Sequence, residues 1–84
     1  MAKIVIYTTT YCPYCRAAKN LLDQKGVEYE EIDLTSDPEL KAKTMRELGW
    51  RTVPIIVVNG TVVGGFNELL MLEREKRLEA LLDS

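Results

Sequence analysis

Histidine is absent from this sequence and cysteine is scarce, because the 84 residues contain no histidine and only two cysteines, Cys12 and Cys15. A structural zinc site takes a full set of histidine and cysteine ligands, which two cysteines in a single chain do not provide. The sequence therefore predicts no metal site. It also offers no histidine to help ionise either thiol.

A strong excess of one charge and a long apolar run are also missing. Eleven Lys and Arg residues are scattered among thirteen Asp and Glu residues, for a net charge of −2, which argues against nucleic acid or an anionic membrane as partner. The apolar run at 4–7 is too short for a signal peptide or a membrane span. We therefore expect a single domain over residues 1–84 that is monomeric and cytoplasmic.

What the sequence does contain is the motif Cys12-Pro13-Tyr14-Cys15. Thiols at this spacing can interconvert with a disulfide, and the second thiol stays beside any mixed disulfide that the first one forms. A purely structural disulfide is the alternative, but a bridge that encloses only Pro13 and Tyr14 removes little chain entropy. In a reducing cytoplasm such a pair is more often catalytic or redox-sensing than structural. The motif therefore predicts thiol redox chemistry.

Apolar periodicity and turn residues predict the element order βαβαββα. The expected strands span 4–7, 27–34, 55–58 and 61–63. The expected helices span Pro13 to the residue before Gly26, Pro38 to the residue before Gly49, and Asn67 to Leu82. The first two strands flank a helix and should be parallel, whereas the last two form a hairpin around Asn59-Gly60. The predicted fold class is α/β, with a four-stranded mixed sheet flanked by three helices.

The two cysteines are expected to differ in their roles because they differ in position on the first helix. Cys12 stands at the helix start, where unpaired N–H groups and the positive end of the helix dipole favour a thiolate. Cys15 lies one turn inside, where the backbone shields it from outside disulfides. Cys12 is therefore the predicted nucleophile and Cys15 the predicted resolving thiol.

Three blocks in order resemble the dithiol glutaredoxins of the CPYC type, a family of the thioredoxin-like superfamily. The blocks are Tyr11-Cys12-Pro13-Tyr14-Cys15, Thr52-Val53-Pro54 and Gly64-Gly65-Phe66-Asn67. The resemblance covers nearly the whole chain and implies a thioredoxin-like βαβαββα fold. It also implies a cis peptide bond between Val53 and Pro54.

The resemblance further implies a glutathione-dependent thiol-disulfide oxidoreductase that reduces protein disulfides and protein–glutathione mixed disulfides. Electrons would come from NADPH through glutathione, and Cys15 or glutathione would resolve the mixed disulfide on Cys12. No bound cofactor is implied, since glutathione is a co-substrate; the other implied partners are disulfide-containing or glutathionylated proteins. The implied glutathione-binding residues are Tyr14, Arg51, Thr52, Val53, Pro54, Gly65, Phe66 and Asn67.

Some positions depart from the family pattern and keep alternatives open. Thr9 stands where many relatives have a lysine that meets a glutathione carboxylate, and Asn67 where an aspartate commonly meets the γ-glutamyl amine. Trp50 replaces a residue that is often polar. One alternative is a redoxin reduced by thioredoxin reductase that donates electrons to ribonucleotide reductase or a similar enzyme. Another is an iron–sulfur cluster carrier, which Pro13 and a resolving Cys15 suit less well.

Overall fold

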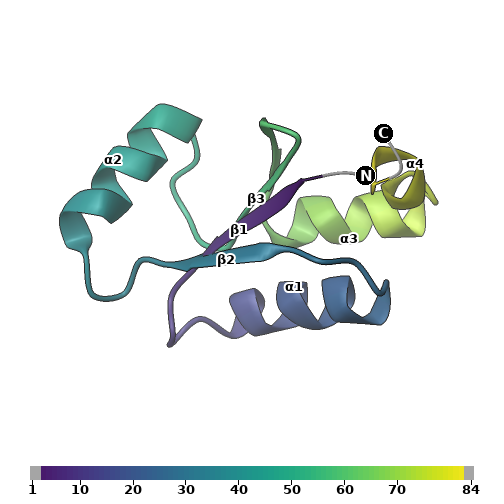
Figure 1. Cartoon of the computed structure of the whole chain (residues 1–84), viewed down its shortest axis with the longest axis horizontal. Helices are drawn as coiled ribbons and strands as arrows, with labels where there is room; N and C mark the ends of the chain where they lie inside the picture. The colour runs from purple at the N-terminus through teal and green to yellow at the C-terminus, as the bar shows by residue number, and fades with distance from the viewer. Residues whose placement is uncertain (1–2, 83–84) are drawn as a thin grey trace.

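The structure, a computed structural model, describes residues 3–82 and contains a sheet with the strand order β2-β1-β3-β4 (Figure 1). The strands are β1 (Ile4–Thr8), β2 (Glu30–Asp33), β3 (Ile55–Val58) and β4 (Thr61–Gly64). The helices are α1 (Pro13–Gln24), α2 (Pro38–Leu48), α3 (Phe66–Arg74) and α4 (Leu78–Leu82). Strand β1 pairs in parallel with β2 and antiparallel with β3, which pairs antiparallel with β4. The predicted α/β class and mixed sheet are confirmed.

The core lies on one face of this sheet. Ile4 and Ile6 of β1 are buried and stand opposite Val58 and Ile56 of β3, so the alternation of side chains along each strand brings these four together. The helices complete the core with Ala18 and Leu22 of α1, Leu69 of α3 and Leu78 of α4. Because α1 packs on β1 in this way, the start of the helix is held close to the end of the strand.

Helix α2 begins and ends where the sequence predicts. Asp37 caps its start by accepting the backbone N–H of Leu40 at 3.0 Å, and Gly49 ends it with φ 68°. Among its apolar side chains, Met45 and Leu48 are partly buried, whereas Leu40 is 39% exposed. Figure 1 shows α2 standing apart from α1 and α3.

The predicted closing helix at 67–82 is wrong as one continuous helix, because α3 and α4 are separate. Lys76 adopts φ 59°, and its N–H donates to the carbonyl of Glu73 at 3.1 Å. The N–H of Arg77 donates to the carbonyl of Leu72 at 2.8 Å, which completes a Schellman ending for α3. Glycine usually occupies the left-handed position of this motif, so a lysine there gives no stop signal in the sequence.

The expected second strand is also shorter than predicted, since β2 begins at Glu30 instead of residue 27. Val27 and Tyr29 belong to the loop before it and pack against the core from there. Their apolar character, which suggested a strand, is explained by this packing. Among residues 3–82, no helix is long and apolar enough to cross a bilayer.

Candidate active site

Strand directions bring the three sequence blocks to one edge of the sheet. Strands β1 and β3 are antiparallel, so the end of β1 and the start of β3 share an edge. Strand β4 runs antiparallel to β3 and therefore ends at that same edge. The loop after β1 carries Cys12, the loop before β3 carries Pro54, and the loop after β4 carries Gly65. Blocks that are far apart in the sequence thus become neighbours.

Cys12 is the N-cap of α1 and points its sulfur at the helix start. Its Sγ accepts the backbone N–H of Cys15 at 3.2 Å, and Pro13 occupies the first turn, where no N–H is needed. The Cys12 thiol also lies 3.6 Å from the carbonyl oxygen of Val53. Only 8% of Cys12 is exposed. A backbone donor aimed at the sulfur is the arrangement that stabilises a negative charge on it.

Cys15 is more deeply buried and remains a neutral thiol at neutral pH. It is 1% exposed, and burial raises the pKa of its thiol from 9.0 to about 12. The neighbouring Cys12 sulfur contributes to that increase in pKa, whereas the backbone of Thr9 and the charge of Lys19 oppose it. Both cysteines are free thiols in this structure. The two sulfurs are therefore close together but chemically unequal.

A polar network extends from Lys19, one helical turn beyond Cys15. The Lys19 ammonium lies 3.0 Å from Glu31 Oε2 on β2, and the Thr8 hydroxyl donates to the same oxygen at 2.7 Å. The hydrogen bond from Thr8 makes the largest contribution to lowering the pKa of Glu31, and the hydrogen bond from Lys19 makes the next largest. The network fixes a cation on the face of α1 that carries Cys15.

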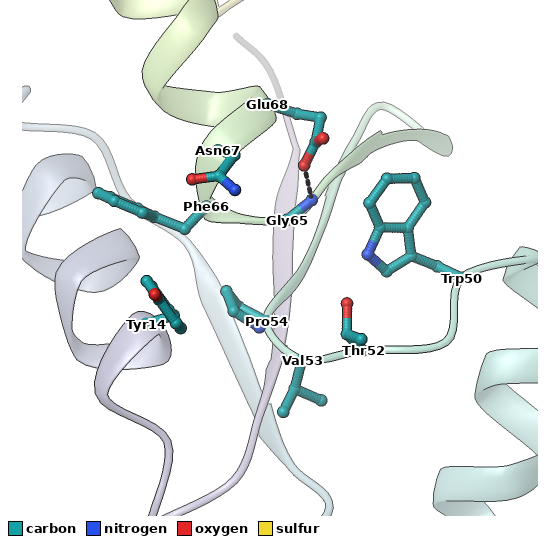
Figure 2. A pocket seen from close by; sticks show the side chains of 9 residues that line it. All are labelled: Tyr14, Trp50, Thr52, Val53, Pro54, Gly65, Phe66, Asn67 and Glu68. Atoms are coloured by element: carbon teal, nitrogen blue, oxygen red, sulfur yellow. Dashed lines mark hydrogen bonds between the residues drawn. The ribbon is translucent and has the colours of Figure 1, made fainter.

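A pocket of about 340 Å³ opens at the shared edge of the sheet (Figure 2). It is lined by Tyr14, Trp50, Thr52, Val53, Pro54, Gly65, Phe66, Asn67 and Glu68. The rings of Tyr14 and Phe66 lie on the same side of it in Figure 2, with centroids 6.2 Å apart. The pocket therefore combines an aromatic wall with backbone and polar groups.

Every residue predicted to bind glutathione lines this pocket except Arg51, which is exposed and lies outside the lining. The peptide bond between Val53 and Pro54 is cis, as the resemblance implies. Thr9, the site of one departure from the family pattern, is 4% exposed and does not line the pocket. The sequence pattern thus located the pocket but did not fix which side chains of each loop face it.

Two lining residues, Trp50 and Glu68, were not among the predicted binding residues. Glu68 Oε1 accepts the backbone N–H of Gly65 at 3.0 Å, which is half of a capping box at the start of α3. The spacing from Gly65 to Glu68 was the signal that could have revealed it. Trp50 contributes an indole N–H that is buried with no hydrogen-bond partner among the described residues.

A metal-binding cluster is not evident in the described part of the chain. No group of three or more His, Cys, Asp or Glu side chains between residues 3 and 82 is arranged to hold a metal ion. The site therefore consists of two thiols with the adjacent pocket, whose lining includes the polar side chains of Thr52, Asn67 and Glu68.

The sequence model of the glutaredoxin family matches residues 4–63, which include both cysteines and the cis proline. The chain belongs to the glutaredoxin family. It is 49% identical over 84 residues to a glutaredoxin of Pseudomonas aeruginosa, and the match covers the whole of both chains. Family membership supports the role of a thiol-disulfide oxidoreductase, in agreement with the cysteine motif.

Solved glutaredoxin structures share the fold. The solution structure of a glutaredoxin from Brucella melitensis has a TM-score of 0.86 and 44% identity, covering 98% of this chain and 89% of that one. The crystal structure of a buckwheat glutaredoxin–glutathione complex has a TM-score of 0.87 and 30% identity, covering 98% of this chain and 77% of that one. The prediction of a thioredoxin-like fold of the glutaredoxin type is confirmed.

Proposed function

We propose that this glutaredoxin uses glutathione as its electron donor and reduces protein disulfides and protein–glutathione mixed disulfides. The observation that carries the proposal is the contact between the Cys12 thiol and the carbonyl of Val53, at 3.6 Å. Val53 and Pro54 line a pocket of about 340 Å³, so a sulfur attached to a ligand in that pocket would lie beside Cys12. The buckwheat relative is described as a complex with glutathione, which supports the same choice of ligand.

The first step is attack of the Cys12 thiolate on a disulfide sulfur of the substrate. A new bond forms to Cys12 as the old disulfide breaks, and the departing sulfur leaves as a thiolate that takes up a proton. The N–H of Cys15, which already points at the Cys12 sulfur, stabilises the attacking charge. Cys12 is therefore proposed to act as the nucleophile.

Resolution follows one of two routes. For a protein disulfide, Cys15 gives up its proton and attacks the Cys12 sulfur, so the reduced protein leaves and Cys12 and Cys15 form a disulfide. Two glutathione molecules then restore both thiols and leave as glutathione disulfide. For a glutathione mixed disulfide, a second glutathione attacks directly. The raised pKa of Cys15, caused chiefly by burial, keeps this thiol protonated at neutral pH, so it must give up its proton as it attacks.

The pocket is proposed to hold glutathione as an extended peptide. The backbone of Val53 would pair with it as an added strand does, while Tyr14 and Phe66 form the wall. Thr52, Gly65 and Asn67 would supply further polar contacts. The role fits a reducing compartment such as the cytoplasm, where such a dithiol is kept available for exchange.

A coupled assay tests the electron donor. The purified protein is given a glutathionylated peptide and NADPH, either with glutathione and glutathione reductase or with thioredoxin reductase alone. We expect rapid NADPH consumption in the first mixture and little in the second. The opposite pattern would replace the proposal with a redoxin served by thioredoxin reductase.

A further inference from the structure

Cys15 has to lose a proton in the proposed exchange, and its surroundings oppose that loss. The thiol is 1% exposed, and burial is the main reason that its pKa rises to about 12. Water cannot solvate a negative charge at such a position, so the resolving step requires another group that stabilises the thiolate.

Lys19 lies one helical turn beyond Cys15, so the two residues share a face of α1. Burial and then the Cys12 sulfur raise the pKa of Cys15, whereas the backbone of Thr9 and the positive charge of Lys19 lower it. Lys19 is thus a cation on the same helix face as a buried thiol that has to become negative.

The position of the Lys19 ammonium is fixed from the neighbouring strands. Its Nζ lies 3.0 Å from Glu31 Oε2 on β2, and the hydroxyl of Thr8, at the end of β1, donates to the same oxygen at 2.7 Å. Thr8 is 1% exposed, and the Lys19 side chain is 28% exposed. The lysine is therefore a partly buried, anchored cation, whose charge is screened less than that of a freely exposed one.

Two carboxylates on β2, Glu31 and Asp33, face the same ammonium. Hydrogen bonds from threonines contribute most to lowering the pKa of both carboxylates, and Lys19 contributes in each case as well. Neither carboxylate contributes to the pKa of Cys15. The ammonium is therefore the charge of this network that acts on the thiol, and Glu31 serves to hold it.

We propose that Lys19, positioned by Glu31, stabilises the thiolate that Cys15 forms when it resolves a disulfide on Cys12. This inference rests on the proposed function, because it takes Cys15 as the resolving thiol. In this step Cys15 releases its proton to water and its sulfur attacks that of Cys12. A bond between the two cysteines forms as the bond from Cys12 to the substrate sulfur breaks, and the departing thiolate takes up a proton.

The test separates the two steps with one equivalent of dipyridyl disulfide, which releases the absorbing product thiopyridone. Attack by Cys12 releases the first thiopyridone at a rate that depends on protein and reagent concentrations. Closure of the disulfide between Cys12 and Cys15 releases the second at a rate that does not. The reagent is uncharged, so a change in the net charge of a variant does not alter its approach. Stopped-flow absorbance at several pH values below the pKa of Cys15 follows both phases.

Lys19→Met should slow the second phase about fivefold at each pH and displace its pH profile to higher pH, because less of the Cys15 thiol is ionised. The first phase should keep its rate, which also shows that the variant is folded. Lys19→Gln should behave in the same way, whereas Lys19→Arg keeps the charge and should close at nearly the wild-type rate. Lys43→Met removes an exposed lysine of α2 and should leave both phases unchanged.

Three results would overturn the role of Lys19 while leaving the role of Cys15 intact. One is a second phase in Lys19→Met and Lys19→Gln that is as fast as in the wild type. Another is an equal slowing in Lys19→Arg and Lys19→Met, which would show that the charge is not what acts. The third is a slowing of both phases by the same factor. If the wild type itself shows no second phase, Cys15 does not resolve the disulfide, and this part of the proposed function fails together with the role of Lys19.

Discussion

Cys12 and Cys15 differ in their surroundings although they lie on the same turn of α1. Cys12 caps the helix and faces the carbonyl of Val53, whereas Cys15 is inside the first turn and 1% exposed. The sequence predicted this division because the motif precedes a helix. It could not predict how strongly Cys15 is buried, since that depends on packing by distant segments. Thr9 illustrates the same limit, because its burial at 4% exposure follows from the tertiary fold.

Burial of Cys15 gives the reduced protein a specific pH dependence. The pKa of this thiol is raised from 9.0 to about 12 in the folded state, chiefly by desolvation. Between pH 9.0 and about 12 the thiol of the unfolded chain is ionised, whereas the thiol of the folded protein still holds its proton. The contribution of Cys15 to stability is therefore complete below pH 9.0 and decreases as the pH rises toward 12. The free energy of unfolding of the reduced wild type should therefore decrease with rising pH more steeply than that of Cys15→Ala.

Chemical denaturation at several pH values in the presence of a reductant measures this difference. The Cys15→Ala variant keeps every other titrating group, so subtracting its curve isolates the thiol. Parallel pH curves for the two proteins would show that the Cys15 thiol ionises in the folded protein as easily as in the unfolded chain.

At the scale of elements, the sequence signals the end of α1 clearly but not the end of α3. Gly26 follows α1 with φ 70°, and its N–H donates to the carbonyl of Asp23 at 3.0 Å. Lys76 ends α3 in the same way, with φ 59° and an N–H that donates to the carbonyl of Glu73. Glycine signals the first ending, whereas a lysine in the left-handed conformation gives no such signal for the second. The break was therefore invisible to composition and periodicity.

The glycine that ends β4 should be the least replaceable glycine near the pocket. Gly64 has φ 129°, and an added Cβ would lie 2.8 Å from Glu68 Cγ and 3.0 Å from Trp50. Gly64→Ala should lower the free energy of unfolding by about 2 kcal/mol or more, because conformational strain and overpacking act together. It should also displace Trp50, which a shift in tryptophan fluorescence would detect.

Gly26→Ala is the matched control for Gly64→Ala. Its φ of 70° imposes a backbone penalty, but no atom lies within 4 Å of the added Cβ. We expect a loss of about 1 kcal/mol and unchanged tryptophan fluorescence. Equal losses of stability in the two variants would contradict the packing of Glu68 and Trp50 against Gly64.

The last helix is tied to the rest of the molecule by Lys25 at the end of α1. Its ammonium lies 2.7 Å from Glu73 of α3 and 2.7 Å from Glu79 of α4. The hydrogen bond to Glu73, followed by that to Glu79, raises the pKa of Lys25, and Lys25 in turn lowers the pKa of Glu79. Lys25→Met should therefore speed hydrogen exchange of the α4 amides.

Lys43→Met provides the comparison for Lys25→Met. Lys43 pairs with Glu47 on the surface of α2 at 4.0 Å, and its side chain is 63% exposed. Such an exposed pair contributes little, so exchange in α2 and α4 should stay as in the wild type. Unchanged α4 exchange in Lys25→Met would show that apolar packing alone holds this helix.

At the scale of the whole molecule, strand direction creates the site. The predicted βαβ unit and hairpin give the direction of β1 relative to β2 and of β3 relative to β4. The antiparallel pairing of β1 with β3, which brings the end of β1 beside the start of β3 and the end of β4, is known only from the structure. The predicted order of strands and helices did not determine which way the loop side chains point. The outward position of Arg51 and the inward positions of Trp50 and Glu68 follow from loop packing, which periodicity does not describe.

Cys12 alone is proposed to receive the disulfide exchange from glutathionylated substrates, whereas Cys15 is proposed to resolve the mixed disulfides that protein disulfides form with Cys12. Mass spectrometry of Cys15→Ser and Cys12→Ser after incubation with a glutathionylated peptide tests this claim most directly. Cys15→Ser should gain the mass of one glutathione, located on Cys12, and Cys12→Ser should gain none. A glutathione adduct on Cys15 in Cys12→Ser, or no adduct on Cys12 in Cys15→Ser, would contradict it.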